Sequence, residues 1–207
     1  METKAMEIPI IPSEKNFNLS KIKIDPKGGV KAEYQITASV EGEPSVIDRT
    51  ESCDRDVHPD LLGLFEDLRS IVGRVFGMTS FLTLLESDEM KLPATKTMAA
   101  RAFADELLQK IEVRGVSWSG SDENAGVVIT AVFETTNGLK TCINTPRIKL
   151  AQISFGFEEQ LETIVDAIKS ETYKYLFEGK QAQLSLFGPS GEPAEEPAAV
   201  ADMPEDM

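Results

Sequence analysis

The stretch Lys21-Ile22-Lys23-Ile24-Asp25-Pro26-Lys27-Gly28-Gly29, with Val30 to Val40 behind it, decides how the fold begins. Polar and apolar residues alternate from Lys21 to Ile24, which is the period of a half-buried strand. Asp25 to Gly29 has the residues of a turn, and Val30 to Val40 is rich in residues that favour strands. The stretch therefore predicts a β-hairpin with strands near 21–25 and 30–40.

The hydrophobic period changes after this hairpin. A third short strand is predicted around Ser45 to Thr50. From residue 59 to 76 apolar residues recur at spacings of three and four, with charged residues opposite, and Pro59 suits a first helical turn. We expect a helix here that buries one face on the sheet. Residues 77–93 read as a connector, followed by a second helix over 94–110.

The same order of elements recurs in the second half of the chain. Strands are predicted at 110–118, 126–135 and 139–145, with Asn137-Gly138 as a hairpin turn, and a final helix is predicted at 157–178. The predicted fold class is therefore α+β, with antiparallel sheets and amphipathic helices.

Short matching segments indicate an internal repeat. We interpret the repeat as a duplicated βββα unit whose halves pair across a pseudo-two-fold axis. The alternative is one undivided α+β domain in which a common pattern recurs. The matching segments are Lys21-Ile22 with Lys110-Ile111, Gln35 to Ala38 with Val128 to Ala131, and Cys53 with Cys142.

The chain divides into five segments on this interpretation. All of the last six acidic residues follow Phe187, where there is no Lys or Arg, which predicts a disordered acidic tail. The segments are a flexible N-terminal arm (1–18), a first βββα half (19–92), a second half with a connecting helix (93–179), a linear motif (180–188) and the tail (189–207).

Composition sets limits on cofactors and compartment. With 207 residues and 41% hydrophobic content, the chain can bury one core, or two small ones that share an interface, without disulfide or metal. Two cysteines and the single histidine His58 cannot build a usual zinc site, so we expect no metal and no cofactor. No signal sequence or apolar run of membrane length is present, so a cytoplasmic protein is expected.

The net charge of −14 and the pI near 4.6 bear on nucleic-acid binding. Binding to duplex DNA depends on phosphate neutralisation by clustered Lys and Arg, so bulk DNA binding is disfavoured. The chain before the acidic tail carries 21 positive and 29 negative charges, since six of the 35 acidic residues lie in the tail. A local basic patch remains compatible with this composition.

No set of residues predicts catalysis, and we expect the protein not to be an enzyme. His58 precedes Pro59 at the start of a helix, where capping is its common role, and no nucleophile in a recognisable setting accompanies it. Cys53 is expected to be a structural thiol. The acidic residues at helical positions are typical of a solvated surface: Glu158, Glu162 and Asp166, and the pair Asp105 and Glu106.

Gln183-Leu184-Ser185-Leu186-Phe187 lies between the last predicted helix and Gly188-Pro189, which stop regular structure. At every position this pentapeptide resembles the Gln-Leu-Ser/Asp-Leu-Phe motif with which bacterial polymerases and repair proteins bind the DNA sliding clamp. The resemblance covers these five residues only. It implies a clamp as partner, with the Gln183 amide at a polar rim and the three apolar side chains in a cleft. The alternative is that these apolar side chains pack on the domain as a terminal strand.

The sequence thus predicts a DNA replication or recombination accessory protein of bacterial or bacteriophage origin that is recruited to the sliding clamp. Its folded part would bind a replication protein or DNA locally, and a homodimer is left open. One alternative is a clamp inhibitor. Another is a single-stranded-DNA-binding protein, because its acidic tail resembles the partner-recruiting tails of that class. In that case the nucleic-acid contacts would be Tyr34, Arg114, Trp118 and Lys140.

Overall fold

The computed structural model describes residues 12–26, 28–40, 43–79, 94–151 and 156–180. Its helices and strands, in chain order, are η1 (Glu14–Asn16), β1 (Phe17–Ile24), β2 (Val30–Val40), β3 (Glu43–Cys53), α1 (Pro59–Val75), α3 (Ala94–Gln109), β4 (Ile111–Ser119), η2 (Asp122–Asn124), β5 (Gly126–Glu134), β6 (Lys140–Asn144), β7 (Ile148–Lys149) and α4 (Glu158–Phe177).

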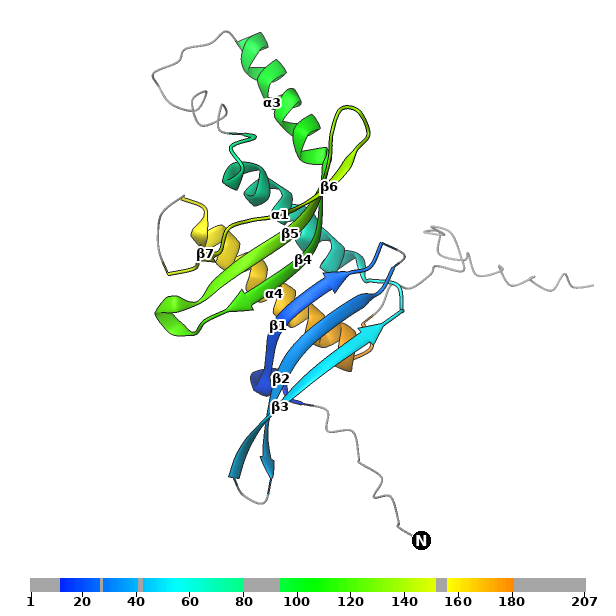
Figure 1. Cartoon of the computed structure of the whole chain (residues 1–207), viewed down its shortest axis with the longest axis vertical. Coiled ribbons are helices and arrows are strands. Elements are labelled where there is room, and N and C mark those ends of the chain that lie inside the picture. Colours follow the sequence, from blue (N-terminus) through cyan, green and yellow to red (C-terminus); the bar gives the residue numbers. More distant parts are fainter. Residues whose placement is uncertain (1–11, 27, 41–42, 80–93, 152–155, 181–207) are drawn as a thin grey trace, which may run out of the picture.

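The strands form one antiparallel sheet in the order β3-β2-β1-β4-β5-β6, with β7 paired to β5 (Figure 1). The predicted α+β class is confirmed, and the predicted helices and hairpins are present at nearly the predicted bounds. Three differences lie in the strands. The first strand begins at Phe17, whereas its predicted start is near residue 21. The third strand runs from Glu43 to Cys53, longer than the predicted 45–50, and the two-residue β7 was not predicted.

The two halves of the chain occupy equivalent places in this sheet. Each half contributes three antiparallel strands followed by a helix, and the halves meet where β1 pairs antiparallel with β4. Ile22 lies opposite Val116 at the middle of that pairing, so a pseudo-two-fold axis passes between these two residues. The topology therefore has the βββα repeat that the sequence predicts.

The register of the repeat differs from the one that the sequence suggested. The axis relates Ile22 to Val116, whereas the sequence match related Ile22 to Ile111. Cys53 and Cys142 are not equivalent either, because Cys53 pairs with Val30 at the end of β3 and Cys142 pairs with Val132 within β6. The matches between short segments were therefore wrong, since similar strand residues recur at several offsets.

Helices α1 and α4 lie on the same face of the sheet and against each other (Figure 1). The ring nitrogen Nδ1 of His58 accepts a hydrogen bond of 3.2 Å from the backbone N of Asp60, so His58 caps α1 as expected, and Pro59 begins the helix. Helix α1 packs on β4 and α4 packs on β1, so each half places its helix on the strand of the other half that lies at the centre of the sheet. One continuous core joins the halves.

The predicted boundary of the N-terminal arm at residue 18 is wrong. Phe17 begins β1, and its ring packs against Tyr34 at 5.0 Å and against Tyr173 and Phe177 of α4 at 5.7 Å between centroids. The Tyr173 hydroxyl donates to the backbone oxygen of Pro12 at 2.7 Å. Residues 12–18 are thus held on α4, because an aromatic residue at position 17 completes a ring cluster that sequence periodicity does not report.

Candidate functional site

The predicted clamp-binding peptide, Gln183 to Phe187, and the predicted acidic tail lie outside the described residues. The described chain ends at Lys180, just after α4. The Lys180 ammonium lies 2.6 Å from Oδ2 of Asp60, at the start of α1, and 2.5 Å from Oε2 of Glu171 in α4. These two ion pairs hold the position from which the chain continues toward the peptide.

Tyr34 is a core residue, which corrects its assignment as a nucleic-acid contact. Only 5% of its surface is exposed, and its ring lies on the helix-covered face between Phe17 and Phe177. Burial first, and then its hydrogen bond to Glu51 Oε2 at 2.9 Å, raises the pKa of Tyr34 to about 12. The ring is therefore not available to stack on a base.

The other three predicted nucleic-acid contacts do not form one surface. Trp118 belongs to the helix-covered face, where the Lys169 ammonium lies 5.7 Å from its ring centroid. Arg114 is paired with Glu112 at 2.6 Å, and Lys140 lies 3.6 Å from Glu134. Lys140 is paired with Glu134, and both side chains point to the face that has no helix over it. Trp118 and Lys140 therefore face in opposite directions.

The face of the sheet opposite α1 and α4 has no helix over it among the described residues (Figure 1). Residues that are directly paired across antiparallel strands point to the same face, so the pairing register identifies what this face presents. One transverse line of directly paired residues crosses six strands. We call it the lysine row, and it consists of Ser52, Lys31, Lys23, Gly115, Thr130 and Asn144.

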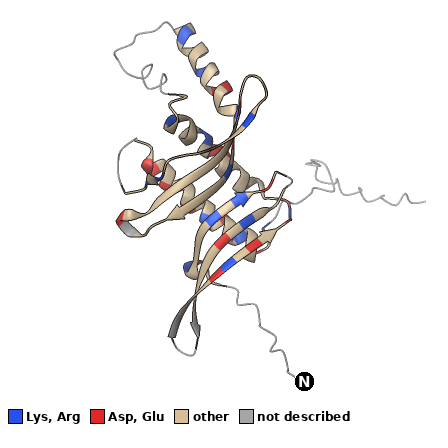
Figure 2. Ribbon diagram, in the orientation of Figure 1, with Lys and Arg blue, Asp and Glu red and all other residues tan. Residues whose placement is uncertain are grey.

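Two lysines face each other at the centre of the lysine row. Lys23 of β1 lies directly opposite Lys31 of β2, and both side chains are exposed. Within the described ranges neither ammonium group has a carboxylate at ion-pair distance, whereas Lys21 in the neighbouring row is 2.9 Å from Glu33. Figure 2 marks in blue the Lys positions along the ribbons of β1 and β2. The alternation at Lys21 to Ile24 could have indicated Lys23, but only the pairing places Lys31 beside it.

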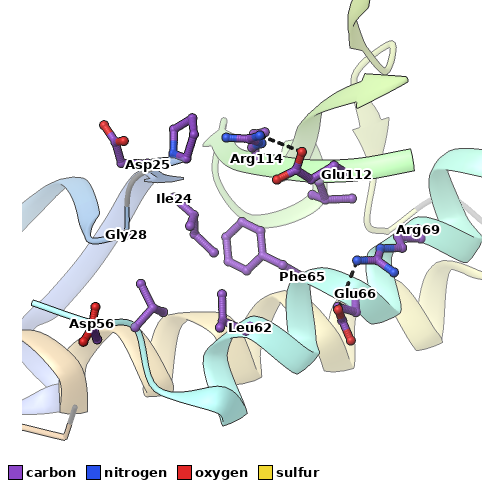
Figure 3. Close-up of a pocket in the computed structure, with 13 residues that line it drawn as sticks. Ile24, Asp25, Gly28, Asp56, Leu62, Phe65, Glu66, Arg69, Glu112 and Arg114 are labelled. Carbon is purple, nitrogen blue, oxygen red and sulfur yellow. Dashed lines mark hydrogen bonds and ion pairs between the residues drawn. The ribbon is translucent and has the colours of Figure 1, made fainter. Parts of the chain in front are cut away.

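A cavity of about 390 Å³ lies where β1 leaves the sheet and α1 faces β4 (Figure 3). Phe65 and Leu62 of α1 line its apolar side, with Ile24 from the end of β1. Its two arginines are each paired with a glutamate, Arg69 with Glu66 at 3.0 Å and Arg114 with Glu112. The lining offers no nucleophile beside a base, so the cavity shows room for a small molecule without indicating a reaction.

The thiol of Cys53 lies in a polar environment beside α4. Arg55 Nε donates to Cys53 Sγ at 2.9 Å, and the Arg55 guanidinium stacks over the ring of Tyr175 at 5.6 Å. Burial raises the pKa of Cys53, but the hydrogen bonds and charge of Arg55 outweigh burial, so its pKa lies below the usual value. Sequence reasoning did not foresee this contact, although Arg55 is only two residues away.

One of the acidic residues that were predicted to be solvated, Glu158, is buried in the structure. Glu158 is buried with 5% exposure, and its Oε2 accepts a hydrogen bond of 3.0 Å from the backbone N of Phe157 at the start of α4. The prediction for Glu158 was therefore wrong, whereas Glu162 and Asp166 are exposed as expected.

A metal centre is not formed by any cluster of His, Cys, Asp or Glu in the part of the chain that the structure describes. None of the helices in that part is long and apolar enough to cross a membrane. No family model matches the chain, and neither the curated proteins nor the solved structures contain a significant match to it.

Proposed function

We propose that this protein is a non-enzymatic accessory factor of DNA replication or recombination, in a bacterium or bacteriophage, that is recruited to the sliding clamp by Gln183 to Phe187. The observation that carries the proposal is the agreement of this peptide with the clamp-binding motif at all five positions. Average residue usage makes such a match a chance event in about one chain in a few thousand of this length. Its place of action would be the cytoplasm.

The position of the peptide supports this function. Gln183 is three residues beyond Lys180, a span of about 10 Å at full extension. The described core has its last members in α4, at Leu176 with Phe177 packed against it, so those residues form a core without the peptide. A clamp that held the peptide would therefore hold the folded domain close to its own surface.

The expected affinity suits transient recruitment. Burying Leu184, Leu186 and Phe187 contributes roughly 1.5 to 3 kcal/mol each. The cost of ordering the segment on binding lowers the total, which leaves a dissociation constant on the order of micromolar. The folded domain is then free to exchange with other clamp-binding proteins.

The test is a titration of purified bacterial sliding clamp with the full chain and with two double variants. Leu186→Ala with Phe187→Ala removes two anchors and should weaken binding by about 3 to 5 kcal/mol, beyond detection for a micromolar complex. Phe76→Ala with Leu139→Ala is the matched control, because it removes the same side-chain types at positions that are 40% and 66% exposed on the folded domain. The control should bind as the parent does.

Two results would decide against clamp recruitment. The proposal fails if the full chain does not bind the clamp, or if the Leu186, Phe187 variant binds as well as the parent. If that variant instead melts several degrees lower, the peptide packs on the domain as a terminal strand. A chain that ends at Gly188 should bind nearly as the full chain does, because the acidic tail contributes little direct contact.

A further inference from the structure

We propose that the lysine row on the uncovered face of the sheet binds the phosphate backbone of one strand of single-stranded DNA. The proposal goes beyond clamp recruitment, and it rests on residues that the clamp-binding peptide does not include. Its central contacts are Lys23 and Lys31, with the Ser52 hydroxyl at one end of the row and the Asn144 amide at the other.

The dimensions and chemistry of the row fit an extended polyanion. Six adjacent strands at about 4.8 Å spacing give a row of about 24 Å. It contains two ammonium groups, two hydroxyl groups, one amide and no carboxylate. Thr130 Oγ1 donates to Asn144 Oδ1 at 2.8 Å, which orients the Asn144 amide nitrogen away from Thr130, as a donor. The two lysines, Ser52 and the Asn144 amide can therefore donate to a phosphate, whereas the Thr130 hydroxyl hydrogen is already used in its bond to Asn144.

Gly115, which is buried, leaves room at the middle of the row for the stem of Lys23. A Cβ atom at this position would lie 2.9 Å from the backbone oxygen of Ile22 and 3.1 Å from Cγ of Lys23. Because glycine has no side chain, the Lys23 stem can lie over β4, and nothing at position 115 projects above the sheet. Position 115 therefore adds no side chain to the row between Lys23 and Thr130.

The fold itself does not require lysine at these positions. The pseudo-two-fold axis relates Lys23 to Ser117 and Lys31 to Val128, since each pair holds the same place in the pairing register. In the other half of the sheet, the equivalent backbone positions thus carry the uncharged residues Ser117 and Val128. Like charges directly opposite each other are destabilising, so the Lys23, Lys31 pair costs stability that a bound anion would recover.

The charges beside the row favour a single strand over a duplex. The parallel line of paired residues on one side of the lysine row contains Glu33, and the line on its other side contains Glu112. On β1 and β2 the lysines without a carboxylate at ion-pair distance therefore lie in one line, which suits one phosphate backbone, whereas the second strand of a duplex would approach carboxylates. The row has no aromatic residue, so binding should be insensitive to base sequence.

The expected binding is weak and salt-dependent. Neutralising two phosphates of a single strand gives a slope of about −1.4 for the logarithm of the association constant against the logarithm of salt concentration. The net charge of −14 further opposes long-range attraction. Local binding of this kind becomes effective when a second contact, such as a clamp on the same DNA, raises the effective concentration.

The test is fluorescence anisotropy of labelled oligothymidine with the full chain at low salt, in the absence of clamp. Lys23→Gln with Lys31→Gln should weaken binding by roughly tenfold or more and flatten the salt slope. Lys15→Gln with Lys96→Gln is the control, because both lysines are exposed, lie away from the row and give the same change of net charge. The control should change affinity by less than about twofold.

Lys31→Glu separates binding from folding. It replaces the like-charge pair by an opposite-charge pair with Lys23, so it should raise the melting temperature while it abolishes DNA binding. Loss of binding together with loss of stability would indicate a structural role and overturn the proposal.

Four further results would also overturn it. They are no binding by the full chain, equal losses in the control, tighter binding to the matching duplex, and lysine-dependent binding only after residues 189–207 are removed. Binding that appears only after removal of residues 189–207 would mean that the acidic tail, and not DNA, binds the lysine row in the full chain. The clamp titration uses neither lysine, so failure of the two proposals can be distinguished.

Discussion

Ser20 of β1 and Arg114 of β4 are related by the pseudo-two-fold axis. Each is the one residue of its strand that the pairing with the neighbouring strand, β2 or β5, skips between paired residues. The register of β1 shifts between Leu19 and Lys21, and that of β4 shifts between Val113 and Gly115. The two bulges are 94 positions apart (114 minus 20), the same separation as Ile22 and Val116 on the pseudo-two-fold axis. The extra residue lets side chains three positions apart, such as Leu19 and Ile22, both enter the core.

Deleting Ser20 should destabilise the fold far more than replacing it. Without the bulge, Leu19 and Phe17 would turn to the uncovered face, which should cost about 3 kcal/mol or more. Ser20→Ala loses only the hydrogen bond from its hydroxyl to the Glu33 backbone oxygen at 2.8 Å, about 1 kcal/mol. Urea unfolding measures both. Equal stability of the deletion and the substitution would mean that the bulge is not needed for core packing.

Lys31→Glu should raise the free energy of unfolding by roughly 0.2 to 1 kcal/mol, because it removes like-charge repulsion with Lys23 and creates an attractive cross-strand pair. Lys149→Glu is the matched control, since Lys149 is exposed and lies opposite Gly126, which has no charge. Chemical denaturation of both variants at low salt checks the expectation. The gain should shrink at high salt, and an equal gain in the control would show a net-charge effect instead.

Arg55→Gln should raise the pKa of Cys53 and move its alkylation to higher pH. The parent thiol is kept acidic by the Arg55 hydrogen bond and charge against the opposing effect of burial. The rate of reaction with iodoacetamide as a function of pH, in a Cys142→Ser background, reports the midpoint. Arg49→Gln removes the same charge from an exposed position on β3 and should leave the midpoint nearly unchanged. Identical profiles for all three proteins would contradict the role of Arg55.

Glu171→Gln should reduce stability at neutral pH and make little difference in acid. Burial raises the pKa of Glu171, but hydrogen bonds from Lys174 and Lys180 outweigh it and lower the pKa below its ordinary value of 4.5. A carboxyl with a lowered folded pKa adds stability that is fully present above pH 4.5 and is lost as the pH falls through the folded value. Unfolding curves of parent and variant should therefore converge at low pH. A gap that stays constant with pH would point to packing and not to charge.

The sequence by itself determined the types and approximate bounds of the helices and strands, and the peptide that resembles a clamp motif. The spacing of apolar residues along 59–76 is a local property, so it predicts α1 whatever the helix packs against. The same holds for the hairpin of β1 and β2 and for the His58 cap. The pentapeptide is likewise read directly, because a linear motif needs no tertiary context.

Only the tertiary structure decided which residues meet. Strand pairing and the two bulges fix the register, and the register places Lys23 opposite Lys31. The same register puts Cys53 and Cys142 at positions that are not equivalent in the two halves. A ring cluster made by distant segments buries Tyr34. The physical reason is that a shift of one residue reverses every side chain of a strand, and long-range packing, which local periodicity does not encode, selects between the two faces.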